Sequence, residues 1–298
     1  MKYKYFICDV FTTERFSGNQ LAVFPEAEGL SETEMQQIAK EFNFSETTFV
    51  FAPQRNGSRK VRIYTPTTEV PFAGHPNIGT AFILANSGVL GELNDPTELT
   101  FEEIAGDVLI NVALDSAGLI SCEISAPQTL SFSKIAPTDL VASALSLDVS
   151  EIITTNHLPI EASVGLTFLF VEIASSKSLV DARIDLAALE ELLDLGFASY
   201  IHAYTKRVEG FDLKARMFAP LDGVAEDPAT GSANCALISL LSHYDPTSDF
   251  DKEWQITQGN EIGRPSVIKG RTEKKDGIVA KSFISGNSVL VSEGTLIV

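Results

Sequence analysis

The sequence predicts an α+β fold of two similar lobes, in each of which strands enclose one central helix. Three observations support this expectation. Short β-branched and aromatic segments bounded by turn residues dominate the chain. Two helical segments are apolar on nearly every side, and one residue pattern occurs twice. The 298 residues, 44% of them hydrophobic and 21% charged, suffice for one large or two modest globular domains.

The expected strands are spread over the whole chain. They cover residues 3–8, 20–24, 48–51, 60–64, 108–112, 119–124, 167–173, 214–218, 278–283 and 288–291.

Helices are expected at five places. Ser31 and Glu34 form a capping box at the start of an amphipathic helix that Asn43 should end. Residues 76–87 and 231–243 are apolar nearly all round, so each helix should be buried inside a sheet. Two further helices, at residues 140–147 and 186–195, have one-sided patterns that place them outside the sheets.

An internal repeat indicates a duplicated architecture. The segment RIYTP at 62–66 resembles RMFAP at 216–220, and HPNIGTA at 75–81 resembles DPATGSA at 227–233. Both copies run from a strand through a loop into a buried helix. A segment rich in Ser, Pro and Thr at 125–138 is the expected linker between the copies. We therefore expect an N-terminal lobe at 1–125, completed by the last strand at about 287–298, and a C-terminal lobe at 126–286.

The composition limits the partners and the compartment. The formal net charge of −18 should repel nucleic acid and anionic lipid surfaces, yet a small anion can still bind in a locally positive pocket. Cys8, Cys122 and Cys235 form no CxxC pair, which fits a reducing compartment, and we expect the cytoplasm and no metal site. The N-terminus lacks the apolar core of a signal peptide, and no segment is suited to cross a membrane.

The two helix starts are the first candidate site. His75 and Asp227 fall at equivalent points of the repeat, where unpaired helix N–H groups can hold a carboxylate. Ser232 or Thr80 would add a hydroxyl donor. The structural alternative is that His75 and Asp227 merely cap their helices.

Glu46 and the segment at 258–266 carry weaker signals. Glu46 precedes an expected strand and, from the sequence alone, could equally be a solvated surface residue. Residues 258–266 have the Gly and Pro punctuation of an ordered turn, for which a structural role is favoured. No Walker loop, HExxH or GxSxG motif is present, so nucleotide-binding, zinc-peptidase and hydrolase functions have no support.

Five blocks together resemble a known family. They are DVFT...GNQLAV at 9–23, SETTF at 45–49, PFAGHPN at 71–77, EDPATGSA at 226–233 and QG...GRP at 258–265. In order and spacing they resemble the PhzF-like family of phenazine-biosynthesis-type isomerases. The resemblance implies a diaminopimelate-epimerase-like fold, in which two similar lobes each wrap a strongly curved, mostly antiparallel sheet around a central helix.

The resemblance also implies a cofactor-free isomerase with its active site between the lobes. By this match Glu46 is the proton-transferring carboxylate, with His75 and Asp227 completing the catalytic set. The expected substrate-binding residues are Gly74, Asn77, Gly231 and Ser232.

The cysteines distinguish this chain from two-thiol epimerases. None of the three stands at a helix start, and each falls in a predicted strand or in a buried helix. We therefore favour a single-base proton shift, out from one carbon and back to another.

The leading hypothesis is an isomerase that acts on a small anionic metabolite and uses no cofactor or metal. Two alternatives stay open at this stage: an epimerase of amino or hydroxy acids, and a non-catalytic small-molecule-binding protein on the same fold. The sequence allows a homodimer.

Overall fold

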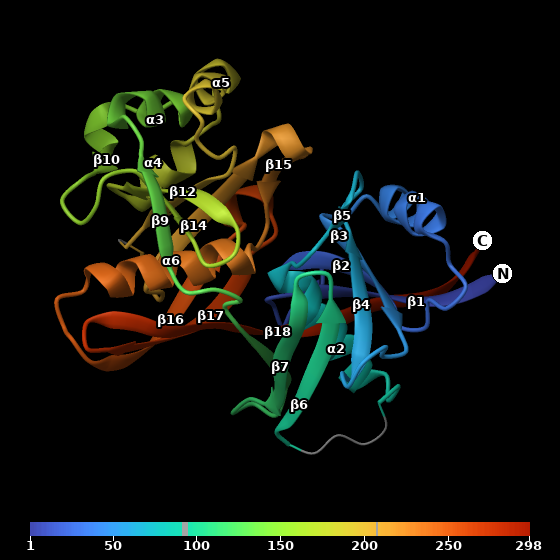
Figure 1. Ribbon diagram of the computed structural model, residues 1–298. Coiled ribbons are helices and arrows are strands. Elements are labelled where there is room, and N and C mark those ends of the chain that lie inside the picture. The colour runs from blue at the N-terminus through green and yellow to red at the C-terminus, as the bar shows by residue number, and fades with distance from the viewer. Residues whose placement is uncertain (91–94, 207) are drawn as a thin grey trace. The chain divides into compact units, whose positions relative to one another are not determined.

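A computed structural model describes residues 1–90, 95–206 and 208–298 (Figure 1). The chain forms two compact units, the first from residues 1–125 and 285–298 and the second from residues 126–284. None of the helices in this described part is long and apolar enough to cross a membrane.

The first unit is a sheet that returns to its starting strand. The strand β18 (Ile278–Ile297), whose second half belongs to this unit, pairs with β1 and also with β8. Between these two, the ladder passes through β2, β3, β4, β6 and β7, with β5 added to β4. The elements are β1 (Lys2–Val10), β2 (Asn19–Phe24), α1 (Glu32–Phe42), β3 (Glu46–Phe51), β4 (Arg59–Tyr64), β5 (Glu69–Val70), α2 (Gly74–Asn86), β6 (Thr97–Glu103), β7 (Gly106–Leu114) and β8 (Ile120–Ser125).

Helix α2 is the central helix of this unit. It contacts β1, β2, β3, β7 and β8, and its residues from Gly74 to Leu84 are all buried. At Gly79 a Cβ atom would approach side-chain carbons of Leu21 and Val10 to 2.6 and 2.7 Å, so only glycine permits this close contact of helix and sheet. The apolar pattern around this helix therefore has the predicted cause.

The second unit holds the remaining elements. They are β9 (Ser131–Ile135), α3 (Thr138–Ala144), η1 (Val149–Glu151), β10 (Ile152–Ile153), β11 (Ile160–Ser163), β12 (Thr167–Ile173), α4 (Ser176–Asp181), α5 (Leu186–Asp194), β13 (Ile201–Thr205), β14 (Leu213–Ala219), η2 (Pro220–Asp222), β15 (Val224–Asp227), α6 (Gly231–Tyr244), β16 (Phe250–Gln258), η3 (Asn260–Ile262) and β17 (Ser266–Lys275). Its central helix, α6, packs on β11, β12 and β17.

The two units repeat one order of strand pairing. In the first unit, β2–β3 is parallel, β3–β4 and β4–β5 are antiparallel, β4–β6 is parallel and β6–β7 is antiparallel. In the second unit, β12–β13, β13–β14, β14–β15, β14–β16 and β16–β17 follow the same series. The central helix comes after the fourth strand of each series. The predicted α+β fold of two similar lobes is confirmed.

Most local expectations also hold. Ser31 and Glu34 form both hydrogen bonds of the capping box, and Asn43 ends α1 in the left-handed conformation. The one-sided helices form as α3 and α5, with Leu189 and Leu192 of α5 in the core of the second unit.

Two expectations about strands are wrong. The segment at 125–138 is not only a linker, because β9 forms within it and pairs with β11. The strands expected at 278–283 and 288–291 are one strand, β18. Its backbone stays extended through the Gly and Asn at 286 and 287 because Val289 and Ser288 pair with Asp9 and Val10.

Candidate functional site

Glu46 and His75 come together in the first unit. Glu46 is the first residue of β3, and His75 is the second residue of α2. His75 Nε2 lies 3.5 Å from Glu46 Oε2, and their side chains are 5% and 18% exposed. Two of the candidate site residues therefore lie close together within one unit.

His75 is a neutral imidazole. Burial lowers its pKa to about 3, while a hydrogen bond with the Gln20 backbone acts in the opposite direction. Asn19 Nδ2 lies 3.4 Å from His75 Nδ1. Nδ1 is therefore the ring nitrogen beside Asn19, and Nε2 is the nitrogen that faces Glu46.

The start of α2 offers backbone donors. Its N-cap residue, Ala73, provides no side-chain hydrogen bond to the helix, so the first N–H groups are left uncapped by that residue. Gly74 is the first helical residue, and Asn77 Nδ2 donates to Ala73 O at 3.0 Å. Glu103 faces Asn77, and burial raises the pKa of Glu103 to about 8, with the Asn77 hydrogen bond opposing this shift.

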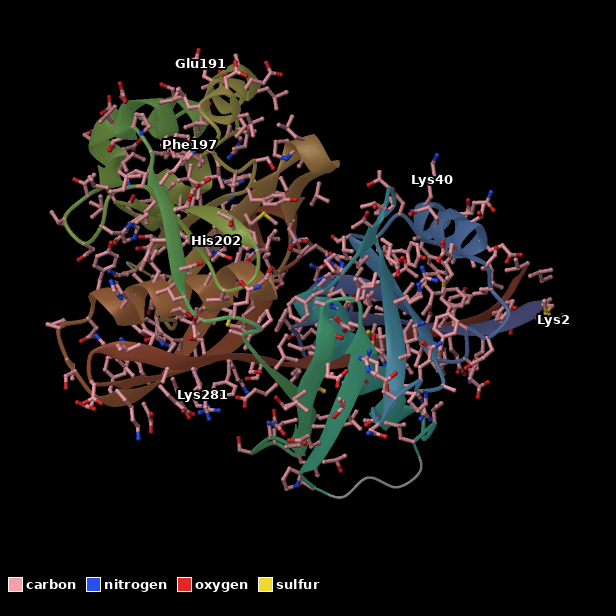
Figure 2. All side chains as sticks on the ribbon, viewed as in Figure 1. Lys2, Lys40, Glu191, Phe197, His202 and Lys281 are labelled. Atoms are coloured by element: carbon pink, nitrogen blue, oxygen red, sulfur yellow. The ribbon has the colours of Figure 1, made fainter. Side chains whose placement is uncertain are left out.

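Asp227 lies in the second unit within a directed chain of hydrogen bonds. Thr230 Oγ1 donates to Asp227 Oδ2 at 2.5 Å and accepts from Gln258 Nε2 at 3.0 Å. Gln258 Oε1 in turn accepts from Asn234 Nδ2 at 2.7 Å. Asn234 Oδ1 lies 3.3 Å from Nε2 of the buried His202, which is labelled in Figure 2. Each donor in this chain points toward Asp227.

The same chain fixes the backbone around Asp227. Gln258 Nε2 also donates to the Asp227 carbonyl at 2.8 Å, and Ser266 Oγ donates to the Pro228 carbonyl at 3.1 Å. Gly259 has a positive φ of 78°, and a Cβ atom there would approach Pro228 O to 2.5 Å. The ordered turn at 258–266 therefore has the structural role favoured from the sequence, which is to support the segment that follows Asp227.

One expectation about the helix starts is wrong. His75 lies inside the first turn of α2, whereas Asp227 ends β15, four residues before Gly231 begins α6. The contacts from Thr230 and Gln258 hold the backbone at 227–230 out of the helix. Capping is excluded as well, because the N-cap residues are Ala73 and Thr230 and neither makes a side-chain cap.

The remaining predicted residues divide between the units. Gly74 and Asn77 share the first turn of α2 with His75. Gly231 is the first residue of α6, and Ser232, next to it, is partly exposed.

The duplication does not extend to Glu46. Thr47 pairs with Tyr64 in the first unit, and Ile201 pairs with Phe218 in the second. Tyr64 and Phe218 are equivalent in the repeat, so the residue that corresponds to Glu46 is Tyr200. Only the first unit carries a carboxylate at this register.

Sequence reasoning assigned no role to several residues of these networks. They are Asn19, His202, Thr230, Asn234 and Gln258. Asn19, Thr230 and Gln258 fall inside the quoted motifs, which is the one signal that could have found them. His202 lies outside every predicted element and has no local signal. Among residues 1–90, 95–206 and 208–298, no three His, Cys, Asp or Glu side chains are grouped as a metal ion would require.

Comparison with known proteins identifies the family. The sequence model of the PhzC-PhzF family, described as phenazine biosynthesis-like proteins, matches residues 8–294. The chain belongs to this family. The trans-2,3-dihydro-3-hydroxyanthranilate isomerases of Pseudomonas chlororaphis and Pseudomonas aeruginosa are each 34% identical to it. The alignments cover 99% of this chain and 99% of the first enzyme, and 98% of this chain and 98% of the second.

Solved structures give the same fold. A PhzF-family protein of Bacillus anthracis superposes with a TM-score of 0.91 at 24% identity and covers 100% of both chains. A predicted epimerase of Pseudomonas aeruginosa has a TM-score of 0.81 at 26% identity and covers 99% of both chains. A probable proline racemase of Agrobacterium radiobacter shares the fold at 11% identity and a TM-score of 0.69, covering 99% of this chain and 93% of the racemase. With full-length relatives that are isomerases, this chain is an isomerase of the PhzF type.

Proposed function

We propose that this isomerase moves a proton between two carbon atoms of a small carboxylate-bearing metabolite, and that Glu46 carries the proton. One observation carries the proposal: the Glu46 carboxylate lies 3.5 Å from the buried imidazole of His75, at the start of a helix without a side-chain cap. A carboxylate beside a neutral imidazole is suited to general acid and base catalysis.

The chemistry needs one proton and no added reactant. Glu46 takes a proton from carbon, and the C–H electron pair moves into the neighbouring bond, so that an existing double bond shifts by one position. Glu46, now a neutral acid, then gives the proton to the carbon at the far end of the shifted system. Because atoms and electrons balance in these two steps, we propose that the reaction uses no cofactor.

His75 and the first turn of α2 have supporting roles in this proposal. The neutral His75 ring offers a polar contact to the substrate beside Glu46, without adding a full positive charge. Gly74 and Asn77 contribute backbone N–H groups of the first turn, which suit a substrate carboxylate.

Asp227 has an orienting role. Its carboxylate is held by Thr230, and we propose that it accepts a hydrogen bond from a polar group of the substrate. The Gly231 N–H and the partly exposed Ser232 hydroxyl at the start of α6 would assist binding.

Epimerisation is the second candidate, because a 26% identical structure is described as a predicted epimerase. That reaction requires an acid and a base on opposite faces of one carbon. The register of Glu46 is filled by Tyr200 in the second unit, which favours a single base and therefore a proton shift.

Three further expectations, on the compartment, the partner and the oligomeric state, belong to the same proposal. Three free cysteines are buried without a disulfide, which supports a reducing compartment such as the cytoplasm. The net charge of −18 supports a small-molecule partner rather than nucleic acid. We propose a homodimer, which light scattering of the purified protein would test.

The deciding experiment uses trans-2,3-dihydro-3-hydroxyanthranilate, the substrate named for the Pseudomonas relatives, in heavy water. NMR should show a shifted double bond, with deuterium at the new C–H position wherever the proton exchanges with solvent. Inversion at one carbon without a shifted double bond would establish the epimerase instead. If this compound is not converted, a metabolite screen for ligands that raise the melting temperature identifies the next substrates to test.

A further inference from the structure

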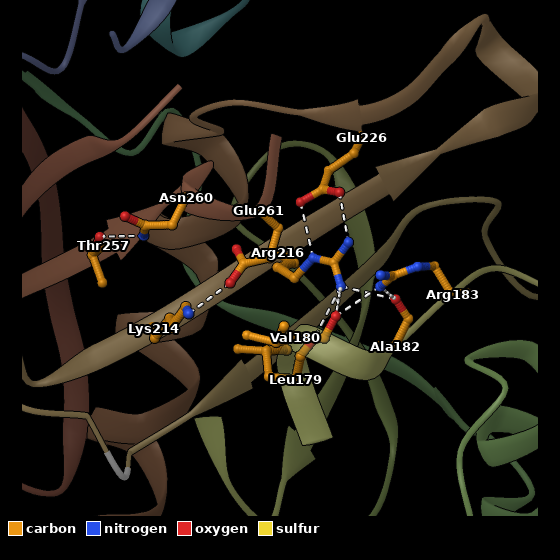
Figure 3. A network of polar contacts seen from close by, with 10 residues as sticks. All are labelled: Leu179, Val180, Ala182, Arg183, Lys214, Arg216, Glu226, Thr257, Asn260 and Glu261. Carbon is orange, nitrogen blue, oxygen red and sulfur yellow. Dashed lines mark hydrogen bonds and ion pairs between the residues drawn. The ribbon is translucent and has the colours of Figure 1, made fainter. Parts of the chain in front are cut away.

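One side-chain arrangement occurs in both units and has no role in the function described so far. In the second unit Arg216 Nε donates to Glu226 Oε1 at 2.9 Å, and Arg216 Nη2 donates to Glu226 Oε2 at 2.7 Å (Figure 3). In the first unit Arg62 makes the same two bonds to Glu69, at 2.7 and 2.6 Å. Arg62 and Arg216 open the two copies of the sequence repeat.

The arrangement stands directly before the candidate site residues. Glu226 precedes Asp227 on β15, a four-residue strand whose pairing with β14 has a register shift between Met217 and Ala219. The strand pairs with β14 only through Asp227 with Met217 and Val224 with Ala219, so side-chain contacts add to the backbone pairing around Asp227. The bidentate pair adds two charge-assisted bonds at the neighbouring residue, from the strand on which Arg216 lies.

Arg216 is itself anchored to a third element. Its Nη1 donates to the carbonyls of Leu179 and Ala182 at 2.8 Å each, at the end of α4 (Figure 3). The Arg216 and Glu226 side chains are only 4% and 7% exposed. A buried ion pair often gives no more stability than apolar residues of similar size, but its fork fixes direction as well as distance.

We propose that Arg216 and Glu226 are positioning residues that hold Asp227 in the orientation needed for isomerisation. This inference rests on the proposed role of Asp227. This function follows from the place of the repeated arginine. In the first unit its glutamate partner lies on β5, ahead of His75 in the chain, and in the second unit the partner directly precedes Asp227.

The test replaces the pair without leaving a buried charge. Arg216→Met with Glu226→Leu keeps the volume roughly constant and is expected to fold, because apolar pairs can substitute for buried ion pairs. Glu226→Gln is a milder second variant. Arg183→Ala is the matched control, because Arg183 donates to the carbonyls of Val180 and Ala182 in the same turn without contacting Glu226.

The expected result is a loss of about 10- to 100-fold in kcat for trans-2,3-dihydro-3-hydroxyanthranilate in both Glu226 variants, with KM changed less. Arg183→Ala should keep the wild-type rate. In an Asp227→Asn background the Met/Leu replacement should add less than about a twofold loss, since residues that act through one group are not additive. Full additivity in that background would mean general structural damage and would overturn the inference.

A readout that needs no substrate completes the test. Hydrogen exchange of the peptide covering 224–230 should be faster in the folded Met/Leu variant and unchanged in Arg183→Ala. A folded Met/Leu variant with wild-type exchange and wild-type kcat overturns the inference while leaving the proposed function intact. Wild-type kcat in Asp227→Asn alone would instead remove the proposed role of Asp227.

Discussion

His75 Nε2 lies 3.5 Å from Glu46 Oε2, yet the two side chains do not form an ion pair. The imidazole is buried, and burial lowers its pKa to about 3, so the ring is neutral near pH 7. A protonated His75 would form an ion pair with Glu46, and this would make the carboxylate a weaker base toward a substrate C–H group. A neutral ring instead places a polar, uncharged group beside the carboxylate.

Glu46→Gln is the first prediction. The amide keeps the shape and can still contact His75, but it cannot take up a proton, so turnover should fall by about 10²- to 10⁴-fold. Folding and ligand binding should stay near wild type. The rate of deuterium uptake from heavy water in single turnover, with calorimetry for binding, checks this. Glu41→Gln on the exposed end of α1 is the control and should change neither quantity.

The outcome for Asp227→Asn separates the two carboxylates. If Asp227 orients rather than transfers, its replacement should weaken binding along with the rate, because a misplaced substrate loses contacts and alignment together. Should Glu46→Gln exchange the substrate proton at the wild-type rate, Glu46 is not the base, and Asp227 or His75 takes that role.

Local patterns predicted much of the fold because they depend on short-range rules. The capping box at Ser31 and the all-round apolar helices at 76–87 and 231–243 appear at nearly the expected bounds. Strand β9 was missed because all five of its residues are exposed, so no buried alternation marks it, and its pairing with β11 is a tertiary contact. Strand β18 was split because Gly286 and Asn287 resemble a turn until their partners are known.

In the candidate site, too, local motifs could be predicted from the sequence and long-range contacts could not. Glu46, His75 and Asp227 could be named from motifs that stand in local sequence. The chain from His202 through Asn234 and Gln258 to Asp227 joins residues far apart in the sequence, and only the packing of β13, α6 and β16 brings them together. Hydrophobic periodicity reports only local structure, so these contacts between distant residues could be found only in the folded chain.

The second prediction is that thiol chemistry is absent. Burial raises the pKa of both Cys122 and Cys235 to about 12, and burial also raises the pKa of Cys8. None of the three is therefore a thiolate near neutral pH. Replacement of all three by Ala should leave kcat largely intact if the protein folds, and iodoacetamide should not inactivate the native enzyme. A stable triple variant without activity would restore a thiol mechanism.

The third prediction concerns Glu103. Burial raises its pKa from an ordinary value of 4.5 to about 8 in the folded state. Between these two pH values the folded protein keeps the proton that the unfolded chain has lost. The free energy of unfolding therefore falls as the pH rises from 4.5 to 8. Each pH unit in this window is worth about 1.4 kcal/mol. Glu103→Gln should therefore be more stable than wild type at pH 7, by up to about 3 kcal/mol. Denaturant unfolding at several pH values measures this difference, which should vanish near pH 4.

Glu102 provides a control of opposite sign at the neighbouring position. Burial opposes its ionisation, but backbone N–H groups of Gly57, Gln54 and Arg55 donate to its carboxylate, and together they lower its pKa. Its contribution to stability is present at neutral pH and is lost as the pH falls. Glu102→Gln should therefore destabilise the protein at pH 7. If both Gln variants shifted stability in the same direction, burial would not be the cause of the Glu103 effect.

The last prediction tests whether the Thr230 hydroxyl holds the Asp227 carboxylate. Thr230 Oγ1 donates to Asp227 Oδ2 and accepts from Gln258 Nε2, so Thr230→Val removes both bonds while keeping the shape. The Gln258 donor and the Asp227 acceptor then each lose a partner. Because both groups are buried, the free energy of unfolding should fall by about 1–3 kcal/mol. The value of kcat/KM should fall as well, because the carboxylate loses the hydroxyl that orients it. Thr230→Ser keeps the hydroxyl and should retain most of the activity, with only the packing of the methyl group lost. Kinetics and unfolding of both variants give the answer: if Thr230→Ser were impaired as strongly as Thr230→Val, packing rather than the hydrogen bond would hold Asp227.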